Sequence, residues 1–115
     1  MARILIVQDE VLVGLMLAAA VEDAGHAVVG PFMRSAPAVD AVTAGAVDAA
    51  LLDVDLGRGE TSYPVAQALK TSGRPFAFLT GHTRERVDTR FADVALLHKP
   101  VSDCELRQVI SALVH

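Results

Sequence analysis

The sequence predicts a doubly wound α/β domain, in which helices cover both faces of a five-stranded parallel sheet with the strand order 2-1-3-4-5. Short apolar runs alternate with segments of helical periodicity, which is typical of strand–helix–strand units with right-handed crossovers. The runs do not alternate apolar with polar residues, so both faces of the strands are expected to be buried. Glycine and proline separate the segments. Together these observations favour the flavodoxin-like arrangement.

The first half of the chain is expected to hold three strands and two helices. The first helix spans about Val11 to Ala24 and ends at Gly25, a residue suited to a helix C-terminus. The second helix starts at Ser35 as its N-cap and runs to Ala44. The strands are the apolar runs at about Arg3 to Val7, Ala27 to Val29 and Ala49 to Leu52.

A third helix and a fourth strand follow. Thr61 or Ser62 is expected to cap the helix, which ends near Gly73, and Pro75 opens the strand. The segment from Thr83 to Phe91 is rich in charge and has one apolar pair at helical spacing. We therefore expect the fourth helix of the domain to be short or irregular and poorly anchored.

A last strand and an amphipathic helix complete the predicted fold. The strand covers about Val94 to Leu97, and Ser102 with Glu105 reads as a capping box at the start of the helix. A length of 115 residues fits one domain with one core. We therefore expect a single domain over residues 1–115, without an output domain. The apolar face of the helix carries Leu106, Val109, Ile110 and Leu113.

Composition and charge exclude several classes of partner. The formal net charge is −4, and non-specific nucleic-acid binding needs Lys and Arg to neutralise phosphates, so no nucleic-acid partner is expected. No apolar stretch reaches the roughly 18 residues of a membrane span, so no membrane insertion is expected. The single cysteine, Cys104, cannot form an internal disulfide, and no secretory signal is recognisable. A reducing, cytoplasmic setting is therefore expected.

Polar side chains follow four of the apolar runs where each run ends. Asp9 follows the first run, Asp53 the third, Thr80 the fourth and Lys99 the fifth. The carboxyl ends of parallel strands meet at one edge of the sheet, which is where open α/β sheets bind ligands. A carboxylate, a hydroxyl and an ammonium would surround one point there, with a second carboxylate available to a metal. This set is typical of phosphoryl chemistry.

The motifs at these ends, IVQDE, LLDVDLG, FLTG and HKPV, resemble those of response regulator receiver domains over the whole chain. The segments VVGP, LGRGETSYPVAQAL and FLTGH, with the weak fourth helix, resemble the FATGUY type of stand-alone receiver. The resemblance implies a CheY-like fold and a phosphorylation-dependent switch or phosphorelay intermediate of two-component signalling. It also implies a protein that is no enzyme beyond catalysing its own phosphorylation and dephosphorylation.

The resemblance assigns a phosphoacceptor and metal ligands. Asp53 would accept a phosphoryl group from the phosphohistidine of a sensor histidine kinase or a histidine phosphotransfer protein. Asp9, an oxygen of Asp53 and the backbone carbonyl of Asp55 would hold Mg²⁺, which prefers oxygen ligands. Thr80 and Lys99 would each bind a phosphoryl oxygen.

Four further positions follow from the same resemblance. Gly81 would leave room for the phosphoryl group, and a cis peptide bond would precede Pro100. In the family the first helix packs against the helical bundle of the kinase. Leu12 and Leu15 lie on a side of this helix away from its core spacing, so we hypothesise that they contribute to docking. The downstream protein partner is not identified.

Two positions depart from the family pattern. Gln8 stands where receivers have the first member of an acidic pair, which generally holds a magnesium-bound water. Glutamine can accept a hydrogen bond from that water but brings no charge, so weaker magnesium binding and slower phosphorylation are expected. Leu96 stands where many receivers have a switch Tyr or Phe, so signalling by an aromatic rotation there is not expected. Glu10 is interpreted as a first-turn helix residue favoured by the helix dipole.

Two alternative functions stay open. Gln8 motivates a degenerate receiver that binds a partner protein without phosphorylation. The run Asp53-Val54-Asp55 imitates the nucleophile motif of haloacid dehalogenase-type phosphatases. That family has the motif on its first strand and further acidic ligands after its Lys, whereas Asp9 lies upstream here, so this alternative is remote.

Overall fold

The sheet has the predicted topology. The computed structural model describes residues 1–81 and 87–114. Its five strands are all parallel and lie in the order β2-β1-β3-β4-β5. The strands are β1 (Arg3–Val7), β2 (Ala27–Phe32), β3 (Ala49–Asp53), β4 (Phe76–Thr80) and β5 (Ala95–His98). The helices are α1 (Val11–Asp23), α2 (Ser35–Thr43), α3 (Tyr63–Thr71), α4 (Asp103–Leu113) and the short 3₁₀ turn η2 (Thr89–Phe91).

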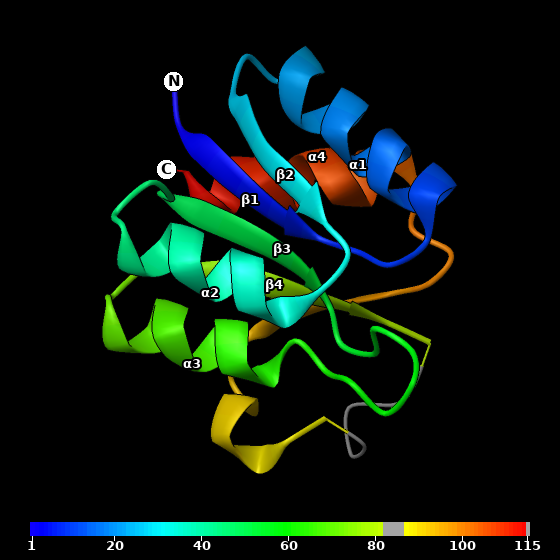
Figure 1. Cartoon of the computed structure of the whole chain (residues 1–115). Coiled ribbons are helices and arrows are strands. Elements are labelled where there is room, and N and C mark those ends of the chain that lie inside the picture. The colour runs from blue at the N-terminus through cyan, green and yellow to red at the C-terminus, as the bar shows by residue number, and fades with distance from the viewer. Residues whose placement is uncertain (82–86, 115) are drawn as a thin grey trace.

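Helices cover both faces of the sheet, with α1 and α4 on one face and α2 and α3 on the other (Figure 1). Successive strand residues point to opposite faces, so each strand feeds two cores. On β1, Ile4 and Ile6 pack with Leu17 of α1 and Ile110 of α4. Leu5 and Val7 face the opposite core, which includes residues of α2, α3 and η2. Because both faces are buried, the strands read as continuous apolar runs, as expected.

The second strand is longer than predicted. The expected end was Val29, because Gly30 and Pro31 follow, yet β2 continues to Phe32. Gly30 has φ +102°, the peptide bond to Pro31 is cis, and the pairing with β1 shifts at this point. The Gln8 N–H then donates to the Phe32 carbonyl at 2.8 Å. Glycine reaches this positive φ without a Cβ clash, and so the chain passes the irregularity and stays in the sheet.

The helix caps agree only partly with the prediction. Ser102 and Glu105 form the predicted capping box, with Ser102 Oγ accepting from the Glu105 N–H at 3.1 Å. Ser35 is the first residue of α2 rather than its N-cap, and its buried hydroxyl donates to the Thr61 carbonyl at 2.6 Å. Ser62 is the N-cap of α3 but accepts no capping hydrogen bond. Ser35 therefore joins α2 to the loop before α3 instead of capping its own helix.

The segment predicted to hold a short or irregular fourth helix, Thr83 to Phe91, contains the 3₁₀ turn η2, and its described part is well anchored. Residues 83–86 of that segment lie outside the described residues, and η2 follows them. Phe91 is fully buried, stacks on Tyr63 at 5.7 Å between ring centroids, and meets Phe78 edge-on at 5.6 Å. The expectation of poor anchoring is wrong for residues 87–91, because it counted apolar residues along the sequence and missed this aromatic cluster.

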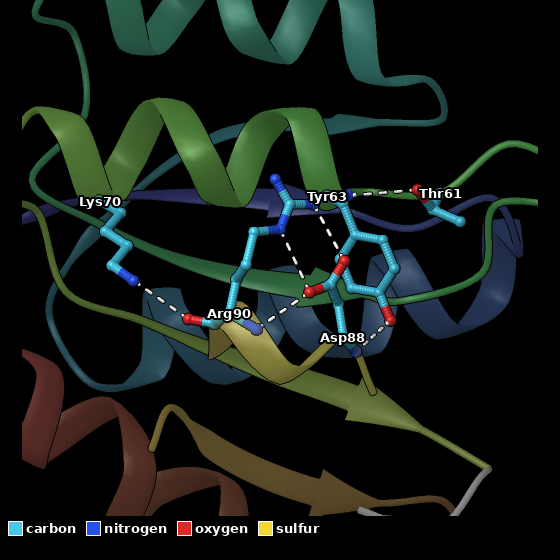
Figure 2. A network of polar contacts seen from close by, with 5 residues as sticks. All are labelled: Thr61, Tyr63, Lys70, Asp88 and Arg90. Atoms are coloured by element: carbon cyan, nitrogen blue, oxygen red, sulfur yellow. Dashed lines mark hydrogen bonds and ion pairs between the residues drawn. The ribbon is translucent and has the colours of Figure 1, made fainter. Parts of the chain in front are cut away.

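Polar contacts also fasten η2 to α3, as Figure 2 shows. The Asp88 N–H donates to the Tyr63 hydroxyl at 3.0 Å, and the Lys70 ammonium donates to the Arg90 carbonyl at 3.0 Å. The Asp88 carboxylate accepts from the Arg90 guanidinium at 3.0 Å, which fixes the turn itself. Asp88 and Arg90 therefore tie η2 to α3, the helix beside it.

Candidate functional site

The carboxyl edge of the sheet brings the predicted residues together. Val7 pairs with Leu52, so Gln8 and Asp53 occupy the next positions of neighbouring strands. Asp53 pairs with Leu79, one residue before Thr80. The Lys99 N–H donates to the Thr80 carbonyl at 2.9 Å just past the end of β5. These four residues, which are far apart in the sequence, therefore lie at the ends of adjacent strands.

An ion pair lies at the centre of this edge. Lys99 Nζ is 2.9 Å from Asp53 Oδ2 and 3.3 Å from Glu10 Oε1. The Asp53 side chain is only 5% exposed, while those of Lys99 and Glu10 are 27% and 60% exposed. Lys99 thus neutralises a buried carboxylate and reaches a second one near the surface. The sequence interpretation of Glu10 as a first-turn residue is wrong, because Glu10 is the N-cap of α1 and its carboxylate turns toward Lys99.

The titration behaviour of the pair follows from burial. Burial raises the pKa of the Asp53 carboxyl above its usual value; Lys99 lowers it in part, and the Asp9 charge raises it again. Burial by itself would lower the pKa of Lys99, but the hydrogen bonds and charges of Asp53 and Glu10 outweigh that effect and raise it. Asp53 is therefore a buried carboxylate whose charge is costly for the fold and depends on Lys99.

Three carboxylates form a group that suits a divalent cation. Oxygen atoms of Asp9, Glu10 and Asp53 lie within 4.8 Å of one another. Mg²⁺ takes oxygen ligands, keeps several waters and binds through one or two carboxylates, so the residues fit this ion. Among the described residues the Asp55 side chain is not part of the group; its expected contribution, through the backbone carbonyl, stays a prediction. The Asp9 carboxylate also lies against Gly57, where a Cβ would come within 3.2 Å of Oδ2.

Gln8 is the least accessible polar residue of the site, at 1% exposure. Its Oε1 accepts the Glu10 N–H at 3.0 Å, while its Nε2 has no hydrogen-bond partner within the described part of the chain. The amide nevertheless lowers the pKa of Asp53, so it lies near that carboxylate without the geometry of a hydrogen bond. Leaving a buried donor unpaired costs about 1–3 kcal/mol.

The remaining predicted residues also lie at this edge. Thr80 is buried, and the space where Gly81 would carry a Cβ is open to 4 Å among the described residues. The peptide bond between Lys99 and Pro100 is cis, as the resemblance implied. Leu96 packs against the core beside α2 and α3. The roles of these residues toward a phosphoryl group stay predictions.

The first helix presents an exposed apolar side next to the site. Leu12 and Leu15 are 81% and 58% exposed, in agreement with their placement away from the core. Met16 is also exposed, at 44%, and the buried residues of the helix are Gly14, Leu17 and Val21. Gly14 takes part in burial because α1 packs closely on Pro31 at that point.

No described helix combines the length and the apolar character that a membrane crossing requires. No model of a protein family matches the sequence, and no curated protein matches it. The solved structures, in contrast, include similar chains of nearly the same length.

The chain is similar to SdrG from Sphingomonas melonis Fr1, with 40% identity, a TM-score of 0.85, and coverage of 100% of this chain and 98% of that one. The BeF₃-activated conformation of SdrG, recorded from Pseudomonas melonis Fr1, is 41% identical with a TM-score of 0.82, covering 98% and 96% of the two chains. The response regulator REC domain of PhyR from Erythrobacter litoralis is 27% identical with a TM-score of 0.84, covering 98% and 89%. Together with the fold and the Asp53–Lys99 edge, these similarities show that the chain belongs to the response regulator receiver family.

Proposed function

We propose that this receiver takes a phosphoryl group from a phosphohistidine onto Asp53 and acts as a phosphorylation-dependent switch or phosphorelay intermediate. The observation that carries the proposal is the 2.9 Å contact between Lys99 Nζ and the buried Asp53 carboxylate, beside Asp9 and Glu10. The similarity to SdrG, one structure of which is a BeF₃-activated conformation, supports it. Assignment to the FATGUY type of receiver stays a prediction.

In the proposed reaction an Asp53 oxygen attacks phosphorus, and a P–O bond forms while the P–N bond of phosphohistidine breaks. The imidazole nitrogen leaves with the electron pair of that bond. The Lys99 ammonium already contacts Asp53 and would pair with an oxygen of the transferred phosphoryl group, where negative charge develops. The Thr80 hydroxyl would bind a second phosphoryl oxygen. Gly81 would leave space for the group. The chain catalyses only this step and the later hydrolysis of its own aspartyl phosphate.

Asp9 and Asp53, with the Asp55 carbonyl and Glu10 nearby, would hold Mg²⁺. When bound, the ion offsets the repulsion between the anionic nucleophile and the anionic phosphoryl group. Burial helps the reaction in another way, since the Asp53 side chain is 5% exposed and is therefore largely shielded from water. Gln8 supplies no charge here, so magnesium binding is expected to be weak for a receiver.

The partners follow from the same proposal. Leu12 and Leu15, exposed on α1 beside the site, would contact a sensor histidine kinase or a histidine phosphotransfer protein in the cytoplasm. A downstream protein would read the phosphorylated state, and neither nucleic acid nor membrane insertion is proposed. Leu15→Asp should slow phosphotransfer at least tenfold, whereas Ala36→Asp, which places the same charge on exposed α2, should not. Equal rates for both variants would remove α1 from the docking surface.

Intact-mass measurement tests the proposed function. Incubation with Mg²⁺ and acetyl phosphate should add the mass of one phosphoryl group to the chain and to Asp48→Asn, but not to Asp53→Asn. Asp48 is a suitable control because it lies at the opposite edge of the sheet, paired with Arg3. An adduct that persists in Asp53→Asn would contradict the assignment.

The second candidate is a degenerate receiver that binds its partner without phosphorylation. The missing carboxylate at Gln8 favours it, because this position normally strengthens magnesium binding. Absence of any adduct with acetyl phosphate and with a phosphorylated histidine phosphotransfer protein would favour this function. The phosphatase alternative is not proposed, since the similarity to SdrG covers the full chain.

A further inference from the structure

The Gln8 amide is oriented by the backbone. Its Oε1 accepts the Glu10 N–H at 3.0 Å, which fixes which end of the amide is oxygen. The Nε2 donor must then point away from Glu10. The side chain has little freedom to turn, because it is 1% exposed and its Cγ lies beneath Gly14 of α1.

The donor end has no partner among the described residues, although buried amides normally have one. Asp53 occupies the neighbouring register position on β3, and its side chain emerges on the same face of the sheet as that of Gln8. The Gln8 amide is therefore a fixed hydrogen-bond donor beside Asp53, the carboxylate proposed to accept the phosphoryl group. The sequence interpretation took Gln8 as an acceptor for a metal-bound water, but its donor has no partner in the part of the chain that the structure describes.

Charge at this edge favours a donor over another acid. Asp9, Glu10 and Asp53 carry three negative charges, and Lys99 is the cation that contacts two of them. A phosphoryl group would carry about −1.5 to −2, on the scale known for phosphorylated hydroxyls, in place of the single negative charge of the Asp53 carboxylate. A carboxylate at position 8 would repel that group, whereas a neutral N–H can donate to it.

We propose that Gln8 Nε2 donates a hydrogen bond to an oxygen of the phosphoryl group on Asp53. This proposal rests on the function proposed above. A carboxylate at this position would strengthen magnesium binding, whereas the amide supplies a hydrogen-bond donor to the phosphoryl group. Position 8 therefore affects two affinities in opposite ways, since an acid there would strengthen magnesium binding and the amide strengthens binding of the phosphoryl group.

Beryllofluoride in the presence of Mg²⁺ mimics the phosphoryl group and allows a direct test by NMR with ¹⁵N-labelled chain. The Gln8 side-chain N–H signals should move downfield and exchange more slowly with water when beryllofluoride binds. Gln8→Met should bind beryllofluoride about tenfold more weakly at saturating Mg²⁺, and Gln67→Met, an exposed control on α3, should bind as the parent does. Gln8→Glu should raise Mg²⁺ affinity but not restore beryllofluoride affinity.

Two results would overturn the proposal, and they are distinguishable. If Thr80 and Lys99 respond to beryllofluoride but the Gln8 signals do not move and Gln8→Met binds as the parent does, the amide holds only a buried water. The small cavity of about 130 Å³ between Gln8, Gly14 and Pro31 would be its place. If beryllofluoride causes no response at Thr80 or Lys99 in the parent chain, both the proposed function and this proposal fail.

Discussion

Removing the Lys99 ammonium should lower the free energy of unfolding, because it leaves the buried Asp53 carboxylate without its cation. In Lys99→Met the apolar stem is kept while the ammonium is lost, so Asp53 Oδ2 loses its partner at 2.9 Å. The Asp53 side chain is 5% exposed and has little water to replace that partner. Asp53→Asn is the complementary change, because it removes the charge that burial disfavours and leaves Lys99 with Glu10.

The size of the effect depends on pH. Breaking a buried ion pair by removing one partner costs about 3–5 kcal/mol, and the lower end, about 3 kcal/mol at pH 8, is expected because Asp53 can take up a proton. Burial already raises the pKa of Asp53, and loss of Lys99 raises it further. A carboxyl whose pKa is higher in the folded than in the unfolded state stabilises the fold at pH values below its unfolded-state pKa of about 3.9. This stabilisation is lost as pH rises through the pKa of the folded state. The penalty of Lys99→Met should therefore be small near pH 4.5 and full at pH 8.

Urea unfolding followed by far-UV circular dichroism, with chelator present, measures this difference. Lys99→Met should lose about 3 kcal/mol relative to the parent at pH 8 and under 1 kcal/mol at pH 4.5. Asp53→Asn should be at least as stable as the parent at pH 8, and Arg107→Met, an exposed control on α4, should change little at either pH. A penalty for Lys99→Met that is equal at both pH values would refute the reasoning about Asp53.

Three further predictions concern Gly57, Phe91 and Asp48. Gly57→Ala and Gly59→Ala should each lower the free energy of unfolding by about 1 kcal/mol, since both glycines have positive φ. Only Gly57→Ala should weaken Mg²⁺ binding in calorimetry, because its Cβ would press on the Asp9 carboxylate. Phe91→Ala should cost about 3–5 kcal/mol in urea unfolding, as a fully buried aromatic does, and a cost below about 1 kcal/mol would show that η2 is not anchored by it. The Arg3 hydrogen bond lowers the pKa of the Asp48 carboxyl to about 2, and NMR titration should find this value. The stability that the Arg3–Asp48 pair adds is present above pH ~3.9 and is lost as pH falls through 2. Asp48→Asn should cost under about 1 kcal/mol because the pair is exposed.

The sheet and its chemical edge were predictable because both depend on local pattern. Strands buried on two faces must be continuously apolar, and parallel strands must end at one edge, so the sequence alone places Asp53, Thr80 and Lys99 together. The capping box at Ser102 was predictable for the same reason, since both of its partners lie within four residues.

Contacts between distant segments could not be predicted in this way. Glu10 contacts Lys99 across 89 positions, and only the fold shows that its carboxylate belongs to the site. Ser35 looked like a cap, but its N–H donates to Glu60 at 2.8 Å, 25 positions away. The orientation of the Gln8 amide was equally hidden, because it depends on the backbone N–H that Glu10 presents at the start of α1.

The most direct measurement locates the phosphoryl group on the chain. After incubation with Mg²⁺ and a phosphorylated histidine phosphotransfer protein, borohydride reduces an aspartyl phosphate to homoserine, and peptide sequencing by mass spectrometry finds the altered position. We expect homoserine in place of Asp53, only when both Mg²⁺ and the phosphodonor are present. Homoserine at Asp9 or Asp55, or an unaltered Asp53 under every condition, would contradict the role assigned to this edge of the sheet.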